Sequence, residues 1–168
     1  MKGMSVGLAA IFSGVVTAAA CGGKGGGECA PLEVKVDGQA VQGLKHAYAI
    51  TQTGSGNTLH QVQIFNHEET CANLTARSRT VPDGEEAFRA FAGGSGTFGK
   101  GVGIDAHTQL GVDVELMTDV PKNPGDKVAV CVPPTTFKPV AGRFKDKEVS
   151  VKGKLEGAFC GVQNLDAK

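Results

Sequence analysis

The stretch VSVKGKLEGAFC, from Val149 to Cys160, decides how this chain folds. Its apolar residues alternate with lysine, serine and other polar or small residues, and they are Val149, Val151, Leu155 and Phe159. A repeat of two residues is typical of a β-strand with one face buried and the other in water. We therefore predict a strand here, with Cys160 on the face opposite the apolar side chains.

Other segments repeat this pattern, and turn residues separate them. Asp37-Gly38, for example, is a hairpin turn sequence. Several half-buried strands joined by Gly, Pro and Asn predict an all-β fold, either an antiparallel β-sandwich or a partly open barrel. The further strands are expected near residues 32–36, 44–50, 61–64, 112–116 and 128–132.

Two short helices are expected between the strands. Asn66–Glu69 and Asp83–Glu86 each begin with a capping residue that is followed by glutamate three positions later, which is the capping-box pattern. The second helix is predicted to continue through residues 87–92, so that Phe88 and Phe91 lie one turn apart and pack on a sheet edge.

The first 20 residues predict export. A single charge, Lys2, precedes an apolar stretch from Met4 to Val16, and small residues follow up to Ala20. This arrangement is typical of a secretory signal peptide. The apolar stretch is shorter than the roughly 20 residues that a membrane-spanning helix needs.

Residues Ala18-Ala19-Ala20-Cys21 resemble the lipobox of bacterial lipoproteins, with Ala18 where these proteins usually have leucine. The resemblance covers the targeting segment alone. It implies that the thiol of Cys21 takes a diacylglycerol and that Cys21 becomes the mature N-terminus. It also implies a location in the bacterial cell envelope. Gly22 favours the outer membrane, because aspartate at that position holds many enteric lipoproteins in the inner membrane.

The number of cysteines fits this interpretation. An odd number of thiols in an exported protein needs an explanation, and acylation of Cys21 leaves four for two disulfides. Pairing of 71 with 160 and of 29 with 131 is preferred among three connectivities, because strand cysteines facing away from the core can bridge to a helix or loop. The alternative is ordinary cleavage after Ala20, which leaves Cys21 a free thiol. The five cysteines are Cys21, Cys29, Cys71, Cys131 and Cys160.

The chain is therefore divided into residues 1–20 as signal peptide, 21–28 as lipidated cysteine and tether, and 29–168 as a single disulfide-bearing β domain. The tether Gly22–Glu28 is rich in glycine and behaves as flexible chain. Its seven residues reach at most about 25 Å. We expect the domain to lie close to its membrane.

Charge argues against nucleic acid as a partner. The chain has 17 basic and 17 acidic residues, and removal of residues 1–20 takes away Lys2 alone, which leaves a net charge of −1. A nucleic-acid-binding domain is expected to carry a basic patch or an excess of positive charge.

The glycine-rich stretch from Gly93 to Gly103 resembles a phosphate loop in part, because Gly94–Lys100 fits GxxxxGK. Gly101 stands where the motif needs Ser or Thr, and the motif also requires a strand before and a helix after. We expect a flexible loop and no nucleotide binding.

Metal and catalytic sites find little support. The cysteines lack the close spacing of zinc ligands. His46 and His60 are expected on adjacent strands, and His67 lies beside Glu68 and Glu69, so a metal site is conceivable there, but structural or exposed histidine is preferred. The sequence has no GxSxG or SxxK motif. No catalytic residue, metal or cofactor is assigned.

We expect a non-enzymatic, membrane-tethered envelope protein with a structural or protein-interaction role. A module that binds a small ligand, or an inhibitor of the envelope, is the alternative, and a hydrolase assembled from distant residues is third. The absence of Trp and the single Tyr argue against an aromatic sugar-binding platform or interaction hot spot.

Overall fold

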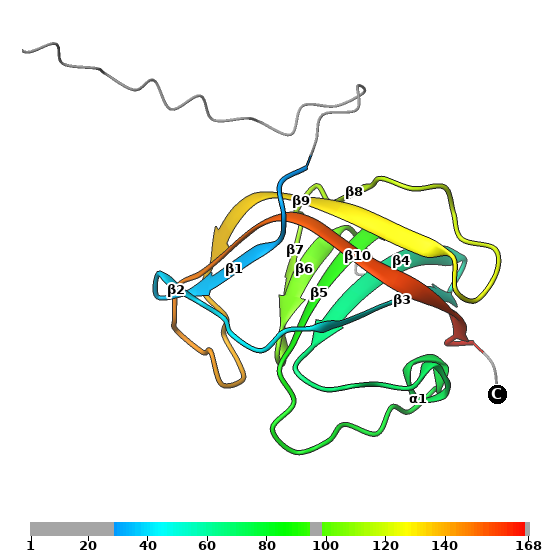
Figure 1. Ribbon diagram of the computed structural model, residues 1–168, viewed down its shortest axis with the longest axis horizontal. Coiled ribbons are helices and arrows are strands. Elements are labelled where there is room, and N and C mark those ends of the chain that lie inside the picture. Colours follow the sequence, from blue (N-terminus) through cyan, green and yellow to red (C-terminus); the bar gives the residue numbers. More distant parts are fainter. Residues whose placement is uncertain (1–28, 95–98, 167–168) are drawn as a thin grey trace, which may run out of the picture.

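The computed structural model describes residues 29–94 and 99–166 (Figure 1). The predicted signal peptide, the lipidation site Cys21 and the tether lie outside these residues. The described chain is mostly strand with one short helix, which confirms the all-β prediction. Its elements are β1 (Glu33–Val36), β2 (Gln39–Ala40), β3 (His46–Gly54), β4 (Asn57–Phe65), α1 (Cys71–Thr75), β5 (Ala87–Gly93), β6 (Gly101–Ile104), β7 (His107–Leu110), β8 (Glu115–Leu116), β9 (Lys127–Phe137) and β10 (Val149–Asn164).

Strand β10, which contains the alternating stretch, is the centre of the sheet. Its first half pairs with β1 and its second half with β3, while β9 pairs with it from Val149 to Ala158 (Figure 1). The order continues from β3 through β4, β5 and β6 to β7. The β10–β3 pairing is parallel, so the sheet is mixed and not purely antiparallel as expected. A parallel neighbour is possible because a long chain segment connects the two strands.

The sheet curls around one apolar core, as in a partly open barrel. The alternating residues of β10 point into this core together with Val128, Val130 and Val132 of β9. Phe88 of β5 lies in the same core and is fully buried. Strand β5 lies close to β8 and β9, at the opposite end of the strand order, which closes much of the curl. We call the surface facing this core the inner face of the sheet.

A second, smaller apolar cluster lies on the outer face. The segment of residues 66–86, which includes α1, passes over this face and places Leu74 of α1 against it. Tyr48 packs at the margin of the cluster. The alternation predicted for β4 places Val62 inside, but Gln61 and Gln63 on the other face are also buried, each 5% exposed. The buried members of the outer cluster are Ile50, Phe65, Leu74, Ala87 and Cys160.

The first helix begins later than expected. Thr70, not Asn66, caps α1, and its side-chain oxygen accepts a hydrogen bond from the Asn73 backbone N–H at 3.2 Å. Asn66 instead joins two chain segments, because its side chain donates to the Gly84 carbonyl and accepts from the Glu86 N–H. Cys71 is the first residue of this helix.

The prediction of a second helix through residues 87–92 is wrong, because these residues form β5. Phe88 and Phe91 point to opposite faces of the strand, and both are buried, with 0% and 9% of their surface exposed. A strand buried on both faces has apolar residues at every position, so its sequence lacks the alternation that reveals a strand. The glutamates that suggested a capping box bind arginines, as described below.

Residues 95–98 of the glycine-rich stretch lie outside the described residues, but both of its ends are strand and not the loop expected, since Gly93 ends β5. Gly101 begins β6, in which Gly101 and Gly103 alternate with buried Val102 and Ile104. A Cβ atom at Gly101 would lie 2.5 Å from the Gln109 carbonyl oxygen, so the close approach of β7 requires glycine there.

Two disulfides join distant parts of the chain, with the preferred connectivity. Cys29 bonds to Cys131 of β9, and Cys71 of α1 bonds to Cys160 of β10. Both strand cysteines lie on the side of their strand away from the apolar core, as predicted. The second bridge fastens α1 to the outer face of the sheet.

Candidate functional site

The densest group of charged side chains lies on the outer face, around Arg79. Its guanidinium donates to the Glu69 carboxylate from Nε at 2.8 Å and to Glu85 from Nη1 at 2.8 Å and from Nη2. It also lies 4.8 Å above the centre of the Phe65 ring. The Glu69 and Glu85 side chains are only 8% and 7% exposed, so water screens this group weakly. We call Glu69, Arg79 and Glu85 the Arg79 cluster.

Hydrogen bonds from the sheet and from α1 hold this cluster in place. The Tyr48 hydroxyl accepts from the Glu69 backbone N–H at 3.1 Å. Asn73 donates to the Glu69 carboxylate at 2.7 Å and accepts from the Thr80 N–H at 2.8 Å. Short contacts between residues 69, 73 and 80 thus fold the segment back on itself, which brings Arg79 to the two glutamates.

Arg79 also lowers the pKa of Glu69. Burial alone would raise the pKa of Glu69, but the hydrogen bonds and positive charge of Arg79 outweigh it and hold that pKa below its ordinary value. Burial lowers the pKa of Arg89, which lies 3.7 Å from Glu85 on the same face.

His67 gives this region the composition of a metal site. Ligand atoms of His67, Glu69 and Glu85 lie within 4.8 Å of one another. The His67 Nε2 atom is buried without a hydrogen-bond partner in the described chain, 3.6 Å from Glu85. The guanidinium of Arg79, however, already bonds three of the four carboxylate oxygens, and a divalent cation would have to displace it. The arrangement is therefore a set of ion pairs, in which Arg79 occupies the position that a cation would need.

The other histidines of the described chain do not come together in one site. His46 pairs with Phe65 and His60 with Thr51, so the two histidines lie at different ends of the β3–β4 hairpin. The Thr51 hydroxyl and His60 Nδ1 are 3.0 Å apart, and burial lowers the pKa of His60. If Thr51 were a nucleophile and His60 its base, catalysis would need a third group that orients the His60 ring. Within residues 29–94 and 99–166, no carboxylate is hydrogen-bonded to His60. His107 stacks on Phe137.

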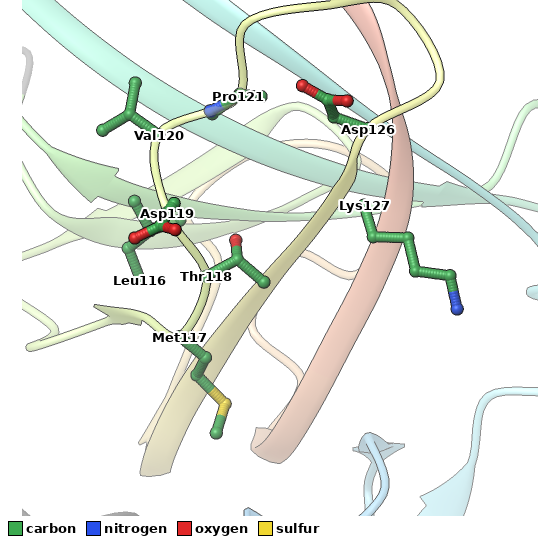
Figure 2. Close-up of a pocket in the computed structure, with 8 residues that line it drawn as sticks. All are labelled: Leu116, Met117, Thr118, Asp119, Val120, Pro121, Asp126 and Lys127. Carbon is green, nitrogen blue, oxygen red and sulfur yellow. The ribbon is translucent and has the colours of Figure 1, made fainter.

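A cavity of about 650 Å³ lies between the β8–β9 loop and the start of β9 (Figure 2). Thr118 and Asp126 line it, and the Asp126 carboxylate accepts the N–H groups of Lys122 and Asn123 at 2.9 and 2.8 Å. These backbone hydrogen bonds lower the pKa of Asp126. The cavity is open and mainly polar, whereas sites for small molecules are mostly enclosed and apolar.

The partial phosphate-loop motif has a strand where a phosphate loop requires a helix. Strand β6 follows Lys100 directly. The Lys100 ammonium instead pairs with the exposed Asp113 carboxylate at 2.6 Å.

No family model, curated protein or solved structure matches this chain. Among the described residues, no helix is long and apolar enough to cross a membrane.

The structure places four of the five candidate cysteines in two bridges, and Cys21 lies outside the described residues. Sequence reasoning missed the Arg79 cluster. Its members are separated by intervals of ten and six residues, which match neither the helix nor the strand period. Buried glutamates beside an arginine give no local sequence signal.

Proposed function

We propose that this protein is a bacterial envelope lipoprotein, anchored through an acylated Cys21, whose β domain has a non-enzymatic structural or protein-interaction role. We further propose that the anchor lies in the outer membrane, because Gly22 follows the acylated residue. In this proposal residues 1–20 are removed, and residues 22–28 separate the lipid from the domain.

The observation that supports this proposal is the pairing of cysteines. Cys29, Cys71, Cys131 and Cys160 are used in two disulfides, which form and persist in oxidising compartments such as the bacterial periplasm. The one cysteine left over is Cys21, the residue at the lipobox position. Export, acylation and an even number of domain cysteines then have a single explanation.

The site chemistry supports a non-enzymatic role. Both carboxylates of the Arg79 cluster are paired with Arg79, and Glu85 also lies near Arg89. His60 has a hydroxyl neighbour but no carboxylate neighbour in the described chain. The cavity beside the β8–β9 loop is open and polar.

Intact-mass analysis of the full chain purified from bacterial membranes tests the proposal. We expect a mature protein that begins at Cys21 with acyl groups on that residue, and two disulfides among the other cysteines. The matched variant Cys21→Ser should be exported and folded but should leave the membrane fraction. An unmodified, soluble wild-type protein would contradict the anchor.

Membrane sorting and partners are tested on the same protein. We expect the wild type in the outer-membrane fraction and the variant Gly22→Asp in the inner-membrane fraction of an enteric host. Mild crosslinking of native membranes should join the domain to another envelope protein, and the absence of any crosslinked partner would oppose the interaction role.

A further inference from the structure

The point at which the tether meets the domain is fixed. Cys29 is bonded to Cys131 of β9, and the Ala30 carbonyl accepts a hydrogen bond from the Lys154 N–H of β10 at 2.6 Å. Pro31 crosses β10 at Gly153, where a Cβ atom would collide with the Pro31 carbonyl oxygen. The chain therefore enters the domain beside β9.

The β8–β9 loop begins beside this entry point. Glu115 of β8 pairs directly with Cys131, and the Met117 N–H donates to the Ala129 carbonyl at 2.8 Å. In Figure 1 the segment before β1, strand β8 and the loop after it lie along one side of the molecule. The α1–β5 connection and the segment between β9 and β10 lie on the opposite side.

This loop exposes apolar side chains. Met117 is 42% and Val120 is 55% exposed. Figure 2 shows both side chains directed away from the backbone of the loop, on different sides of it. The loop, residues 117–126, contains two acidic residues, Asp119 and Asp126, and one basic residue, Lys122, so its net charge is −1. Its chemistry suits an uncharged lipid surface better than an anionic one.

Tether length limits which side of the domain can face the lipid. Residues 22–28 reach at most about 25 Å. A compact domain of this size is roughly 37 Å across, from the usual scaling of the radius of gyration. The tether cannot pass around the domain, so the side that carries the entry point stays toward the membrane.

We infer that residues 117–121 of the β8–β9 loop rest on the zwitterionic phospholipid surface of the membrane that holds the anchor, with Met117 and Val120 in the interface. This inference depends on the proposed acylation of Cys21. Isolated exposed apolar residues are common and carry no meaning alone. Here the disulfide, the strand register and the tether length together place Met117 and Val120 at the lipid surface.

A tryptophan reporter tests the inference, because the chain contains no Trp. The lipidated full chain with Val120→Trp is reconstituted into phosphatidylcholine vesicles with brominated acyl chains, which quench tryptophan on contact. The matched controls are Val81→Trp and Val140→Trp, whose valines are 60% and 72% exposed and lie in the two segments on the far side. All variants are checked for both disulfides and for an unchanged melting temperature.

We expect the emission of Val120→Trp to fall to roughly half or less of its value in unbrominated vesicles, as for a side chain at the headgroup boundary. The two controls should keep their emission, and added salt should change neither result. Equal quenching of all three reporters, or none at Val120→Trp, would overturn the inference.

Vesicle flotation and intact mass separate this result from the proposed function. An acylated protein that floats with vesicles but shows no quenching at position 120 retains its anchor and overturns the loop contact alone. An unacylated protein that stays soluble overturns both.

Discussion

The two faces of the curled sheet are stabilised in different ways. The inner face packs valine, phenylalanine, alanine and leucine from most of the strands, and charged side chains are absent from its buried cluster in the described chain. The outer face has a small apolar cluster, a disulfide, three buried glutamines and the Arg79 cluster. The first face depends on burial of apolar surface, and the second on specific bonds.

The covering segment explains this difference. Residues 66–86 contain the five-residue helix α1, which is too short to be stable in isolation. Leu74 is the only residue of α1 that is buried. So little apolar surface cannot hold the segment in place alone. The Cys71–Cys160 bridge and the hydrogen bonds Gln163–Ala76 and Glu69–Tyr48 link it to the sheet, while the ion pairs of Arg79 hold the segment together internally. The segment and the sheet are thus fastened by a few identifiable interactions.

The largest expected effect contrasts two phenylalanines of one strand. Phe88→Ala removes a fully buried ring from the inner core and should lower the free energy of unfolding by about 3–5 kcal/mol. Phe91→Ala is the matched variant on the outer face, where the ring lies beside Gly103. We expect it to cost less, because glycine offers few atoms for packing.

Urea unfolding of both variants, followed by circular dichroism, measures these costs. Equal losses, or a greater loss for Phe91→Ala, would contradict the view that apolar packing is concentrated on the inner face.

The second prediction concerns the bridge of the outer face. The double variant Cys71→Ala/Cys160→Ala should lose about 2–4 kcal/mol, because the disulfide no longer restricts the unfolded chain. Hydrogen exchange should then accelerate in α1 while β9 and the first half of β10 stay protected.

The matched control is Cys29→Ala/Cys131→Ala, which removes the other bridge. It should leave exchange in α1 unchanged. Acceleration in α1 in both double variants would show that the covering segment is not fastened locally.

The third prediction concerns Arg79. Arg79→Leu leaves the Glu69 and Glu85 carboxylates buried without their partner and should cost about 2–3 kcal/mol at neutral pH, somewhat less than for a fully buried pair. The matched variant Arg143→Leu removes a half-exposed pair with Glu86 and should cost about 1 kcal/mol or less.

The pH dependence of the free energy of unfolding tests the same ion pairs, and its direction follows from the pKa of Glu69. In the wild type the pKa of Glu69 is lower in the folded state than its ordinary value of 4.5. Its ionisation therefore stabilises the protein above that pH, and this stabilisation is lost as the pH falls through the lower folded value. In Arg79→Leu the hydrogen bonds and charge of Arg79 are lost, and only the hydrogen bonds from Thr70 and Asn73 still oppose burial, which favours the protonated carboxyl. The difference in stability between wild type and variant should narrow as the pH falls below about 4.5. A constant difference would contradict the ion-pair account.

The same contrast explains what the sequence could predict. The first half of β10 faces the core on one side, so Val149, Val151 and Leu155 alternate with polar or small residues and could be recognised. Strand β5 is buried on both sides and contains two aromatic rings three residues apart, which mimics a helix. Its strand conformation is imposed by its neighbours β4 and β6.

The outer face was predictable only through its cysteines. Cys160 opposite the apolar residues of its strand indicated a bridge, because that position is exposed unless another segment covers it. The Arg79 cluster depends on the fold of residues 66–86, which no periodicity describes. The parallel pairing of β10 with β3 joins strands about 100 residues apart in the chain, and nothing local specifies it.

The smallest effect is expected at the margin of the sheet, where neither face covers the chain. Lys100 and Asp113 form an ion pair with side chains 43% and 75% exposed. Such pairs gain little, because water and salt screen them and both side chains lose conformational freedom. Lys100→Ala should therefore change the free energy of unfolding by no more than about 0.5 kcal/mol, and Asp113→Ala, its matched partner, by as little. Magnesium ATP should leave the melting temperature of the wild type unchanged, since β6 begins directly after Lys100. A dose-dependent rise that disappears in Lys100→Ala but persists in Asp113→Ala would instead assign Lys100 to a phosphate site, and the edge of the sheet would then have a function that neither face explains.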